Sequence, residues 1–170
     1  MPTQSERRDA TKKAIIDAAS RAYEGGDLSV SLEVIGADAG VTKGSIFYHF
    51  GSRAGLLRAV ALVTLARLER RLAQDLDEID VRTWVRTVLA EQATPRGRML
   101  FAINDELALI DELDDIDPFP YLTLRLREFD VSAPPTVIAA AMLQYARQLA
   151  FGNTAGGDLD DVMADLDGLL

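Results

Sequence analysis

The chain has 170 residues, no cysteine and a formal net charge of −9 at pH 7. This length is enough to bury a core in one or two small domains. The missing cysteine excludes disulfide frameworks, thiolate zinc sites and cysteine nucleophiles. The start of the chain is too polar for a signal peptide, and the longest apolar-rich run, residues 137–151, is too short to span a bilayer. We therefore expect a cytoplasmic protein.

The acidic charge is concentrated in the C-terminal part of the chain. Residues 1–60 carry 8 Lys/Arg and 7 Asp/Glu, whereas residues 61–170 carry 10 and 20. A nearly neutral N-terminal part neutralises few phosphates. If it contacts DNA, we expect modest affinity and a shallow salt dependence.

The first predicted helix covers residues 9–24, because apolar side chains recur there at helical spacing at Ile15, Ala18, Ala19, Ala22 and Tyr23. The glycine pair at 25–26 ends it. Residues 1–8 are predicted to be a mobile arm. Two interpretations remain for the basic side chains in and beside this arm, which either approach a DNA phosphate or minor groove or are simply solvated: Arg7, Arg8, Lys12 and Lys13.

Two short helices joined by a tight turn are predicted over residues 31–50. Ser31 and Thr42 are good N-caps for the two helices, and Gly40 ends the first of them. Gly36 supplies the small residue that two closely crossing helices need. A small residue, a turn glycine four positions later, an apolar residue and a polar cap are typical of a helix-turn-helix, whose second helix enters the DNA major groove.

Three parts of the sequence resemble the TetR-like (tetracycline-repressor-like) family of bacterial transcriptional regulators. They are A-G-V-T-K-G-S-I-F-Y-H-F at 39–50, G-S-R-A-G-L-L-R-A-V at 51–60, and the amphipathic helix upstream. The resemblance spans about residues 15–60 and includes the signature Y-H-F-x-S-R. It implies a DNA-binding domain at residues 8–60 and a C-terminal ligand-binding and dimerisation domain at residues 61–170.

The rest of the chain also has the pattern of helices. Ser52 caps a long predicted helix that runs from 53 to about 79. Proline and glycine separate the later predicted helices, at 81–92, 96–113, 119–129, 135–152 and 158–169. No alternating strand pattern occurs. The predicted fold class is therefore all-α, with a three-helix helix-turn-helix head, a C-terminal helical bundle and about nine helices in total.

The start of the second short helix carries the side chains best suited to read DNA. Lys43 can donate to a guanine or a phosphate, and Gly44 lets the backbone approach the groove closely. Tyr48 offers its ring to a thymine methyl group and its hydroxyl to a phosphate. The resemblance implies a phosphate contact for His49, the only histidine. The candidate DNA-binding residues are Ser31, Thr42, Lys43, Gly44, Ser45, Tyr48, His49 and Arg53, whereas Phe47 and Phe50 are predicted to lie in the core.

Two residues depart from the family pattern. Glu33 stands where a basic residue is common, and we expect it to repel phosphate. Gly55 stands where an acidic residue often completes the capping box of Ser52, so that helix start should be less well fixed. Arg53 opens the same helix and is expected to reach the DNA backbone. These departures predict a weaker or more selective DNA-binding protein.

The C-terminal part offers candidates for a ligand pocket and a subunit interface. A bundle pocket is usually apolar with a few polar groups, and the predicted lining is Trp84, Phe101, Asn104, Tyr121 and Arg125, with Phe119 and Phe129 beside them. Each could equally be plain core. The helix at 135–152 is apolar nearly all round. It is either a central helix inside the chain or a subunit interface, for which the candidates are Ile138, Met142, Tyr145 and Leu149.

Two acidic runs do not predict a metal site. The run D-E-L-D-D-I-D at 111–117 lacks the glycine and the closing glutamate of a calcium loop. The run D-L-D-D at 158–161 fits the start of a helix. No cofactor is predicted. With one histidine, no cysteine and no paired acid and base, we expect no enzyme.

Two functional hypotheses follow. The first is a homodimeric, ligand-responsive repressor that binds a pseudo-palindromic operator. Its partners would be double-stranded DNA, a second copy of itself and an unidentified small-molecule effector, without a membrane. The alternative is a helical protein-interaction module whose degenerate head no longer binds an operator.

Overall fold

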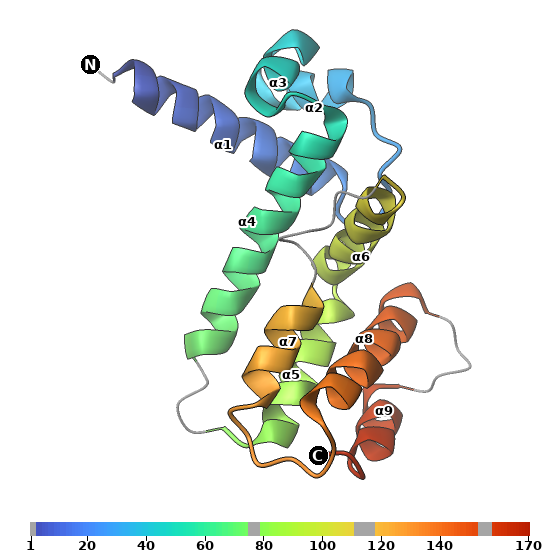
Figure 1. The fold of residues 1–170 in the computed structure, drawn as a ribbon. Coiled ribbons are helices and arrows are strands. Elements are labelled where there is room, and N and C mark those ends of the chain that lie inside the picture. The colour runs from blue at the N-terminus through green and yellow to red at the C-terminus, as the bar shows by residue number, and fades with distance from the viewer. Residues whose placement is uncertain (1–2, 75–78, 111–117, 153–157) are drawn as a thin grey trace.

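The computed structural model describes residues 3–74, 79–110, 118–152 and 158–170, and Figure 1 shows their arrangement. Over these ranges the regular structure is helical and contains no strand, as the predicted all-α class requires. The helices are α1 (Gln4–Ala22), α2 (Leu32–Ala39), α3 (Lys43–Phe50), α4 (Arg53–Gln74), α5 (Val81–Gln92), α6 (Pro95–Ala108), α7 (Pro118–Leu126), α8 (Pro135–Phe151) and α9 (Leu159–Leu166). The acidic run at 111–117 lies outside the described residues.

Helix α1 begins earlier than predicted. The Thr3 hydroxyl accepts a hydrogen bond from the Glu6 backbone N–H at 3.2 Å, and the Glu6 carboxylate accepts one from the Thr3 N–H at 2.6 Å. This capping box satisfies two backbone donors that a helix start leaves free. The prediction of a mobile arm is therefore wrong from Thr3 onward, because the chain is already capped there and helical from Gln4.

The helix-turn-helix forms as the sequence predicts. Ser31 and Thr42 cap α2 and α3, and Gly40 adopts the left-handed conformation with φ +71°. At the crossing, a Cβ on Gly36 would lie 2.8 Å from the Val41 carbonyl oxygen, so no larger residue fits without a shift. The Val41 N–H donates to the Gly36 carbonyl at 2.8 Å, which closes the turn.

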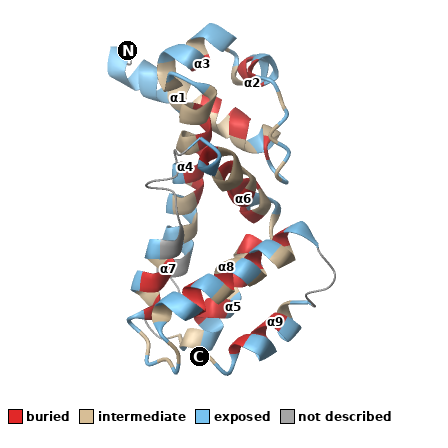
Figure 2. Ribbon diagram, turned by 45° about the vertical axis from the view of Figure 1, so that its right-hand side comes forward, coloured by how far each residue is buried: buried red, intermediate tan, exposed pale blue. Residues whose placement is uncertain are grey.

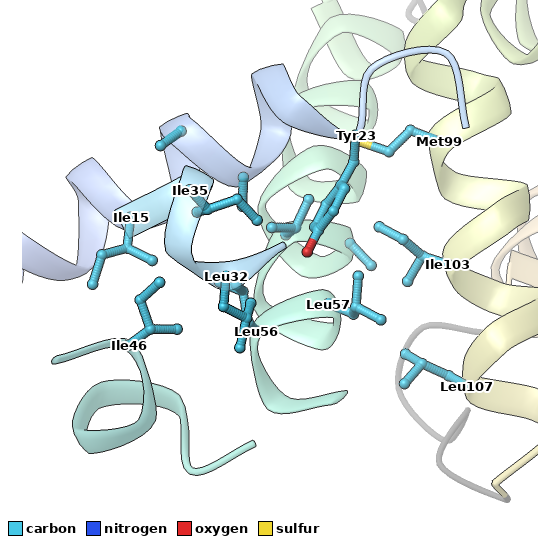
Figure 3. Packing of buried hydrophobic residues seen from close by; sticks show 14 of the residues in the cluster. Ile15, Tyr23, Leu32, Ile35, Ile46, Leu56, Leu57, Met99, Ile103 and Leu107 are labelled. Atoms are coloured by element: carbon cyan, nitrogen blue, oxygen red, sulfur yellow. The ribbon is translucent and has the colours of Figure 1, made fainter. Parts of the chain in front are cut away.

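A first hydrophobic cluster joins the helix-turn-helix to α6 (Figure 3). Ile35 and Ile46 of the head are fully buried in it. Helix α6 contributes four residues to the same cluster: Met99, Leu100, Ile103 and Leu107. The core of the head is therefore not confined to residues 8–60. A movement of α6 would directly change the packing of the head.

A second hydrophobic cluster lies at the other end of the molecule and is built from α5, α6, α7, α8 and α9. Helix α8 packs against the other four of these helices, and its buried side lies inside the group in Figure 2. Trp84 is the largest fully buried side chain of this cluster. Among the described residues, no helix combines the length and the apolar character needed to cross a membrane.

Helix α4 connects the two clusters. Leu56, Leu57 and Val60 belong to the first, and Leu68 packs against the second. The start of α4 is well fixed, contrary to the expectation for Gly55. The Ser52 hydroxyl accepts from the Gly55 N–H at 2.9 Å.

Glycine is required at position 55 in this conformation. A Cβ there would lie 2.1 Å from the Phe50 carbonyl oxygen, closer than any real Cβ contact. The missing acidic side chain of a capping box is thus the consequence of a close backbone approach between the end of α3 and the start of α4.

Candidate nucleic-acid interface

The first turns of α3 present the predicted DNA-reading side chains on one surface. Thr42, Lys43 and Gly44 are exposed, and Tyr48 is 73% exposed. Ile46 on the opposite side is fully buried and anchors the helix. Ser45, also predicted here, is partly buried.

Phe47 is 41% exposed, so its predicted place in the core is wrong. Its ring lies on the outer side of α3, with the Lys43 ammonium 5.9 Å from the ring centroid. Phe50 does pack against the first cluster, as predicted. The outer side of α3 is therefore more aromatic than the sequence interpretation allowed.

The N-terminal turns of α1 extend this surface. The Arg8 guanidinium carbon lies 5.9 Å from the centroid of the Tyr48 ring. A hollow beside it is lined by Gln4, Ser5, Arg8, Tyr48 and His49. Gln4 and Ser5 were missed because the segment was predicted to be mobile. The signal that could have found them is the T-x-x-E capping-box pattern at residues 3–6.

His49 lies in a positive environment at the edge of this hollow. Its Nδ1 atom is buried and has no hydrogen-bond partner in the part of the chain that the structure describes, and its ring meets Tyr48 edge-on with 5.1 Å between centroids. Burial lowers the pKa of His49, and the positive charges of Arg8 and Lys12 lower it further. A site where cations gather around a histidine favours an anion such as a phosphate group.

Glu33 and Lys43 form an ion pair that joins α2 to α3. The Lys43 Nζ lies 2.8 Å from Glu33 Oε1, and both side chains are largely exposed. The hydrogen bond from Lys43 holds the pKa of Glu33 below its usual value. Lys43 is the only lysine or arginine in α3. Glu33 therefore pairs with the lysine that is predicted to read DNA, in addition to the repulsion of phosphate that the sequence predicts.

Arg53 turns away from this surface toward partners within the chain, so its predicted contact with the DNA backbone has no support from this geometry and stays a prediction. Its guanidinium turns inward and donates to Glu106 Oε1 at 3.1 Å, to the Tyr23 hydroxyl at 3.3 Å and to the Leu28 carbonyl. These partners are a residue of α6, the C-cap of α1 and a residue of the loop after it. Ser31, in contrast, is exposed, and its oxygen accepts from the Val34 backbone N–H at 3.4 Å, while its side chain also hydrogen-bonds to the Glu33 carboxylate.

The predicted ligand-pocket residues lie in or around the second cluster. Trp84 is fully buried and packs on Phe129 with 5.8 Å between centroids, and Phe101 is 8% exposed. Three of the set have a buried polar atom without a hydrogen-bond partner among the described residues: Trp84 Nε1, Asn104 Oδ1 and Arg125 Nε. Burial raises the pKa of the fifth residue, Tyr121. That these residues bind a ligand stays a prediction.

The predicted subunit-interface residues pack within their own chain. Ile138 is fully buried and Met142 nearly so. The Tyr145 hydroxyl donates to Asp165 on α9 at 3.0 Å, and Leu149 packs against the second cluster. Ile138 and Met142 are enclosed by their own subunit and do not fit an interface, whereas Tyr145 and Leu149 are partly exposed and their place in an interface stays a prediction. The two enclosed residues fit the central helix that was the alternative interpretation. The outward side of α8 carries Val137, Ala140, Gln144, Arg147 and Phe151.

The acidic start of α9 has a structural role. The Asp158 carboxylate accepts from the Asp161 N–H at 3.2 Å, and the Asp161 carboxylate accepts from the Asp158 N–H at 3.1 Å. This is a capping box. In the part of the chain that the structure describes, no three histidine, aspartate or glutamate side chains are grouped to hold a metal ion.

The part of the sequence that forms this surface is similar to known proteins. Residues 15–60 match the sequence profile of bacterial regulatory proteins of the tetR family. The HTH-type transcriptional regulator TtgR of Pseudomonas putida is 36% identical over 90 residues, which are 51% of this chain and 42% of TtgR. The similarity thus spans less than half of that relative.

Solved structures share the fold over most of the chain. A proposed transcriptional regulator from Rhodococcus sp. RHA1 superposes with a TM-score of 0.70 at 18% identity, covering 90% of each chain. NalD of Pseudomonas aeruginosa, the secondary repressor of the MexAB-OprM multidrug efflux pump, gives 0.52 at 20% identity, covering 97% of this chain and 98% of NalD. Residues 15–60, with their capped helix-turn-helix, therefore match the tetR family of regulatory proteins, and the solved structures share the all-α fold of the chain.

Proposed function

We propose that this chain is a homodimeric transcriptional regulator whose α3 helix reads a pseudo-palindromic operator. The observation that carries the proposal is the outer surface of α3. Lys43, Gly44 and Tyr48 are exposed there together, on a helix that is capped at Thr42 and anchored by the buried Ile46. A rigid helix with a donor and a glycine at its N-terminal end suits the major groove.

The surroundings of α3 supply phosphate contacts. Arg8 lies beside Tyr48, and His49 adjoins the same hollow. Contacts of this kind fix the position of the protein on the duplex, whereas Lys43 and Tyr48 would select the bases. Ser31, exposed at the start of α2, is a further candidate for a phosphate contact.

The outward side of α8 is the proposed dimer face. Val137 and Phe151 are each 47% exposed, and the small Ala140 lies between them on the same side. A two-fold dimer buries the same face of both subunits. It would present two α3 helices to successive major-groove faces, about 34–36 Å apart on B-DNA.

The response to a ligand would pass through α4 and α6. Both helices contact the first cluster and also reach the second, so a change in the C-terminal packing moves the head. A ligand releases DNA only if it binds the DNA-free arrangement more tightly than the DNA-bound one. Repression needs only occupancy of the operator, and NalD, which shares the fold, is a repressor.

The ion pair between Glu33 and Lys43 favours a second candidate function. If that pair holds Lys43 away from DNA at all salt concentrations, the protein would be a helical interaction module with an inactive head. Purification at low salt separates the two. A stoichiometric protein partner without retained DNA supports the module, whereas bound DNA supports the regulator.

The proposal is tested by selecting genomic fragments with the purified protein at about 50 and 200 mM salt, a range over which phosphate contacts weaken steeply. Lys43→Ala and Tyr48→Ala should each lower affinity for the recovered fragment at least about tenfold, since a good base contact is worth that much. Arg86 is the control, because it is an exposed, ion-paired cation on α5. Arg86→Ala should bind like the wild type, and the proposal fails if Lys43→Ala and Tyr48→Ala do so as well.

The dimer face is tested by sedimentation equilibrium. Val137→Asp places a charge on the outward side of α8 and should yield monomers. Leu124→Asp changes a 60% exposed apolar residue on α7 and should leave the dimer intact. A monomeric wild type, or a dimer that survives Val137→Asp, would contradict the assigned face.

A further inference from the structure

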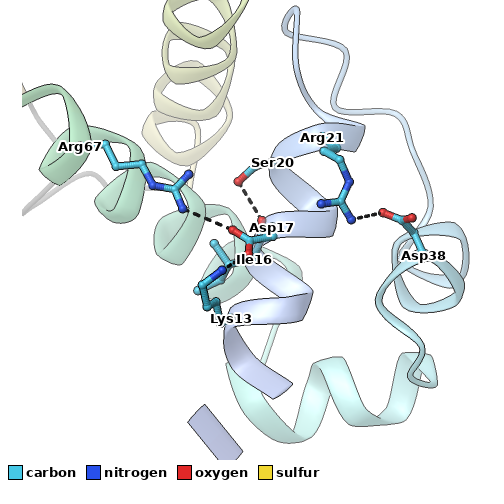
Figure 4. A network of polar contacts seen from close by, with 7 residues as sticks. All are labelled: Lys13, Ile16, Asp17, Ser20, Arg21, Asp38 and Arg67. Carbon is cyan, nitrogen blue, oxygen red and sulfur yellow. Dashed lines mark hydrogen bonds and ion pairs between the residues drawn. The ribbon is translucent and has the colours of Figure 1, made fainter. Parts of the chain in front are cut away.

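A cavity of about 230 Å³ lies where α1 of the head meets α4, α5 and α6. It is separate from the predicted ligand pocket, because none of the residues Trp84, Phe101, Asn104, Tyr121 and Arg125 lines it. Figure 4 shows the side formed by α1 and α4, where Ser20 and Asp17 face Arg67. A molecule bound here would touch both the DNA-binding head and the helices that connect it to the second cluster.

The floor of the cavity combines apolar side chains with the side-chain amide of Gln92. Met99 and Leu100 of α6 are 1% and 6% exposed and provide the apolar part. Gln92, the last residue of α5, is only 9% exposed, yet its side chain makes no hydrogen bond to any residue that the structure describes. The Gln92 amide is not among the buried polar atoms that lack a partner, so it keeps access to the cavity that it lines. It can therefore donate a hydrogen bond to a ligand oxygen there.

The rim of the cavity carries an excess of positive charge. Four arginines line it, namely Arg21, Arg67, Arg71 and Arg96, against three carboxylates, Asp17, Glu24 and Glu91. Arg71 contacts both carboxylate oxygens of Glu91, and Arg21 pairs with Asp38 outside the cavity.

Two of these arginines keep donors for a ligand. Arg67 reaches Asp17 through one nitrogen at 3.3 Å, which leaves other N–H groups free. Arg96 has no ion-pair partner among the described residues. Arg96 also lies in the first turn of α6, where the helix dipole adds positive potential.

We propose that this cavity binds a small organic anion that has an apolar body and a carboxylate. The apolar body rests on Met99 and Leu100, Gln92 bonds to an oxygen of the ligand, and Arg96 pairs with the carboxylate. The volume is below the ~300–1,000 Å³ of sites for drug-sized ligands, so the ligand is small. By bridging α1 to α4 and α6 it fixes the orientation of the head. The bound ligand thereby lowers operator affinity. This regulatory step rests on the proposed function.

The binding step is tested without DNA, by nuclear magnetic resonance on the full chain. The probes are benzoate, salicylate, hexanoate and decanoate, up to about 10 mM, which detects millimolar dissociation constants. Benzyl alcohol and hexanol are the uncharged counterparts. At least one carboxylate should shift the Gln92 side-chain amide signals and the backbone signals of Arg96 and Gly97, more strongly than the alcohols do.

Matched variants locate the site. Gln92→Leu and Arg96→Ala should each weaken binding of the responding carboxylate about tenfold or more. Arg82→Ala should leave it unchanged, because Arg82 is an exposed arginine of α5 that pairs with Asp167 away from the cavity. The proposal is overturned if no carboxylate binds, if the alcohols bind equally well, or if the shifts fall on Trp84 and Asn104 instead.

The regulatory step has its own readout. The responding carboxylate is added to the protein bound to its recovered DNA fragment, and operator affinity should fall in the wild type but not in Arg96→Ala. Unchanged affinity despite binding would overturn the regulatory step and leave the site standing. A protein that binds the carboxylate but no DNA would overturn the proposed function alone.

Discussion

Arg53 and Glu106 lie 3.1 Å apart and tie the start of α4 to α6. The partners of Arg53 also include Tyr23, whose ring centroid is 5.7 Å from the guanidinium carbon. One side chain therefore holds the head helix α1, the connecting helix α4 and the C-terminal helix α6 together. Arg53 therefore connects the head to the C-terminal helices.

Arg53→Ala should lower the free energy of unfolding by about 1–2 kcal/mol, because a part-exposed ion pair and hydrogen bonds to a charged group are lost. Urea denaturation measures this. The salt dependence of DNA binding should keep its slope. If Arg53 instead contacted a phosphate, the slope of log K against log salt would fall by about 0.9.

Glu33→Gln should raise DNA affinity about three- to tenfold at about 50 mM salt, because it frees Lys43 and removes a negative charge near phosphate. Fluorescence anisotropy on the recovered fragment measures this. The same change in a Lys43→Ala background separates the two causes. Little gain there means that Glu33 acts through Lys43, whereas a full gain means that Glu33 acts on phosphate directly and contradicts the role of the ion pair.

The single histidine makes the pH dependence simple to follow. Burial and the charges of Arg8 and Lys12 lower the pKa of His49 in the folded chain. The unfolded chain therefore binds the proton at higher pH, so stability rises with pH through the window just below about 6.5 and is lost as pH falls through it. Urea denaturation at pH 5.5 and 7.5 should show this loss, and His49→Gln should reduce it.

The imidazole signals give the pKa of His49 directly in a nuclear magnetic resonance titration. We expect a value below that of an exposed histidine in the free protein and a higher value when DNA is bound, because phosphate favours the charged ring. A pKa that DNA leaves unchanged would contradict a phosphate contact by His49.

Two glycines of the head should respond differently to alanine. Gly55→Ala should cost about 1–3 kcal/mol of stability, because its Cβ collides with the Phe50 carbonyl. A Cβ on Gly44 meets only Thr42 Oγ1 at 3.7 Å, so Gly44→Ala should fold at least as well as the wild type. Its DNA affinity should nevertheless fall if the backbone approaches the groove there. Thermal unfolding and anisotropy measured together distinguish the two effects, and wild-type affinity in Gly44→Ala would contradict the close approach.

Local sequence signals predicted the head well and its contacts less well. The caps at Ser31 and Thr42 and the glycines at 36 and 40 act within a few residues, so their consequences can be read from the sequence. The direction of Arg53 depends on Glu106, 53 positions later, and no local pattern contains that information.

The sequence predicts that the C-terminal part is helical, but it does not predict what each side of a helix contacts. Helical spacing identifies an apolar helix at 135–152, but it cannot tell whether a neighbouring helix or a second subunit covers each side. Ile138 and Met142 were therefore assigned to the wrong partner, while the outward Val137 and Phe151 were overlooked. The cavity beside Gln92 was beyond prediction for the same reason, since its walls come from four separate helices.

The central claim is that two α3 helices of a two-fold dimer read DNA. Hydroxyl-radical footprinting on the recovered fragment tests it most directly. We predict two protected segments related by a two-fold axis, with centres about 10 base pairs or a multiple of that apart, and loss of both in Lys43→Ala and Tyr48→Ala. A single protected segment, or protection that the variants retain, would contradict the claim.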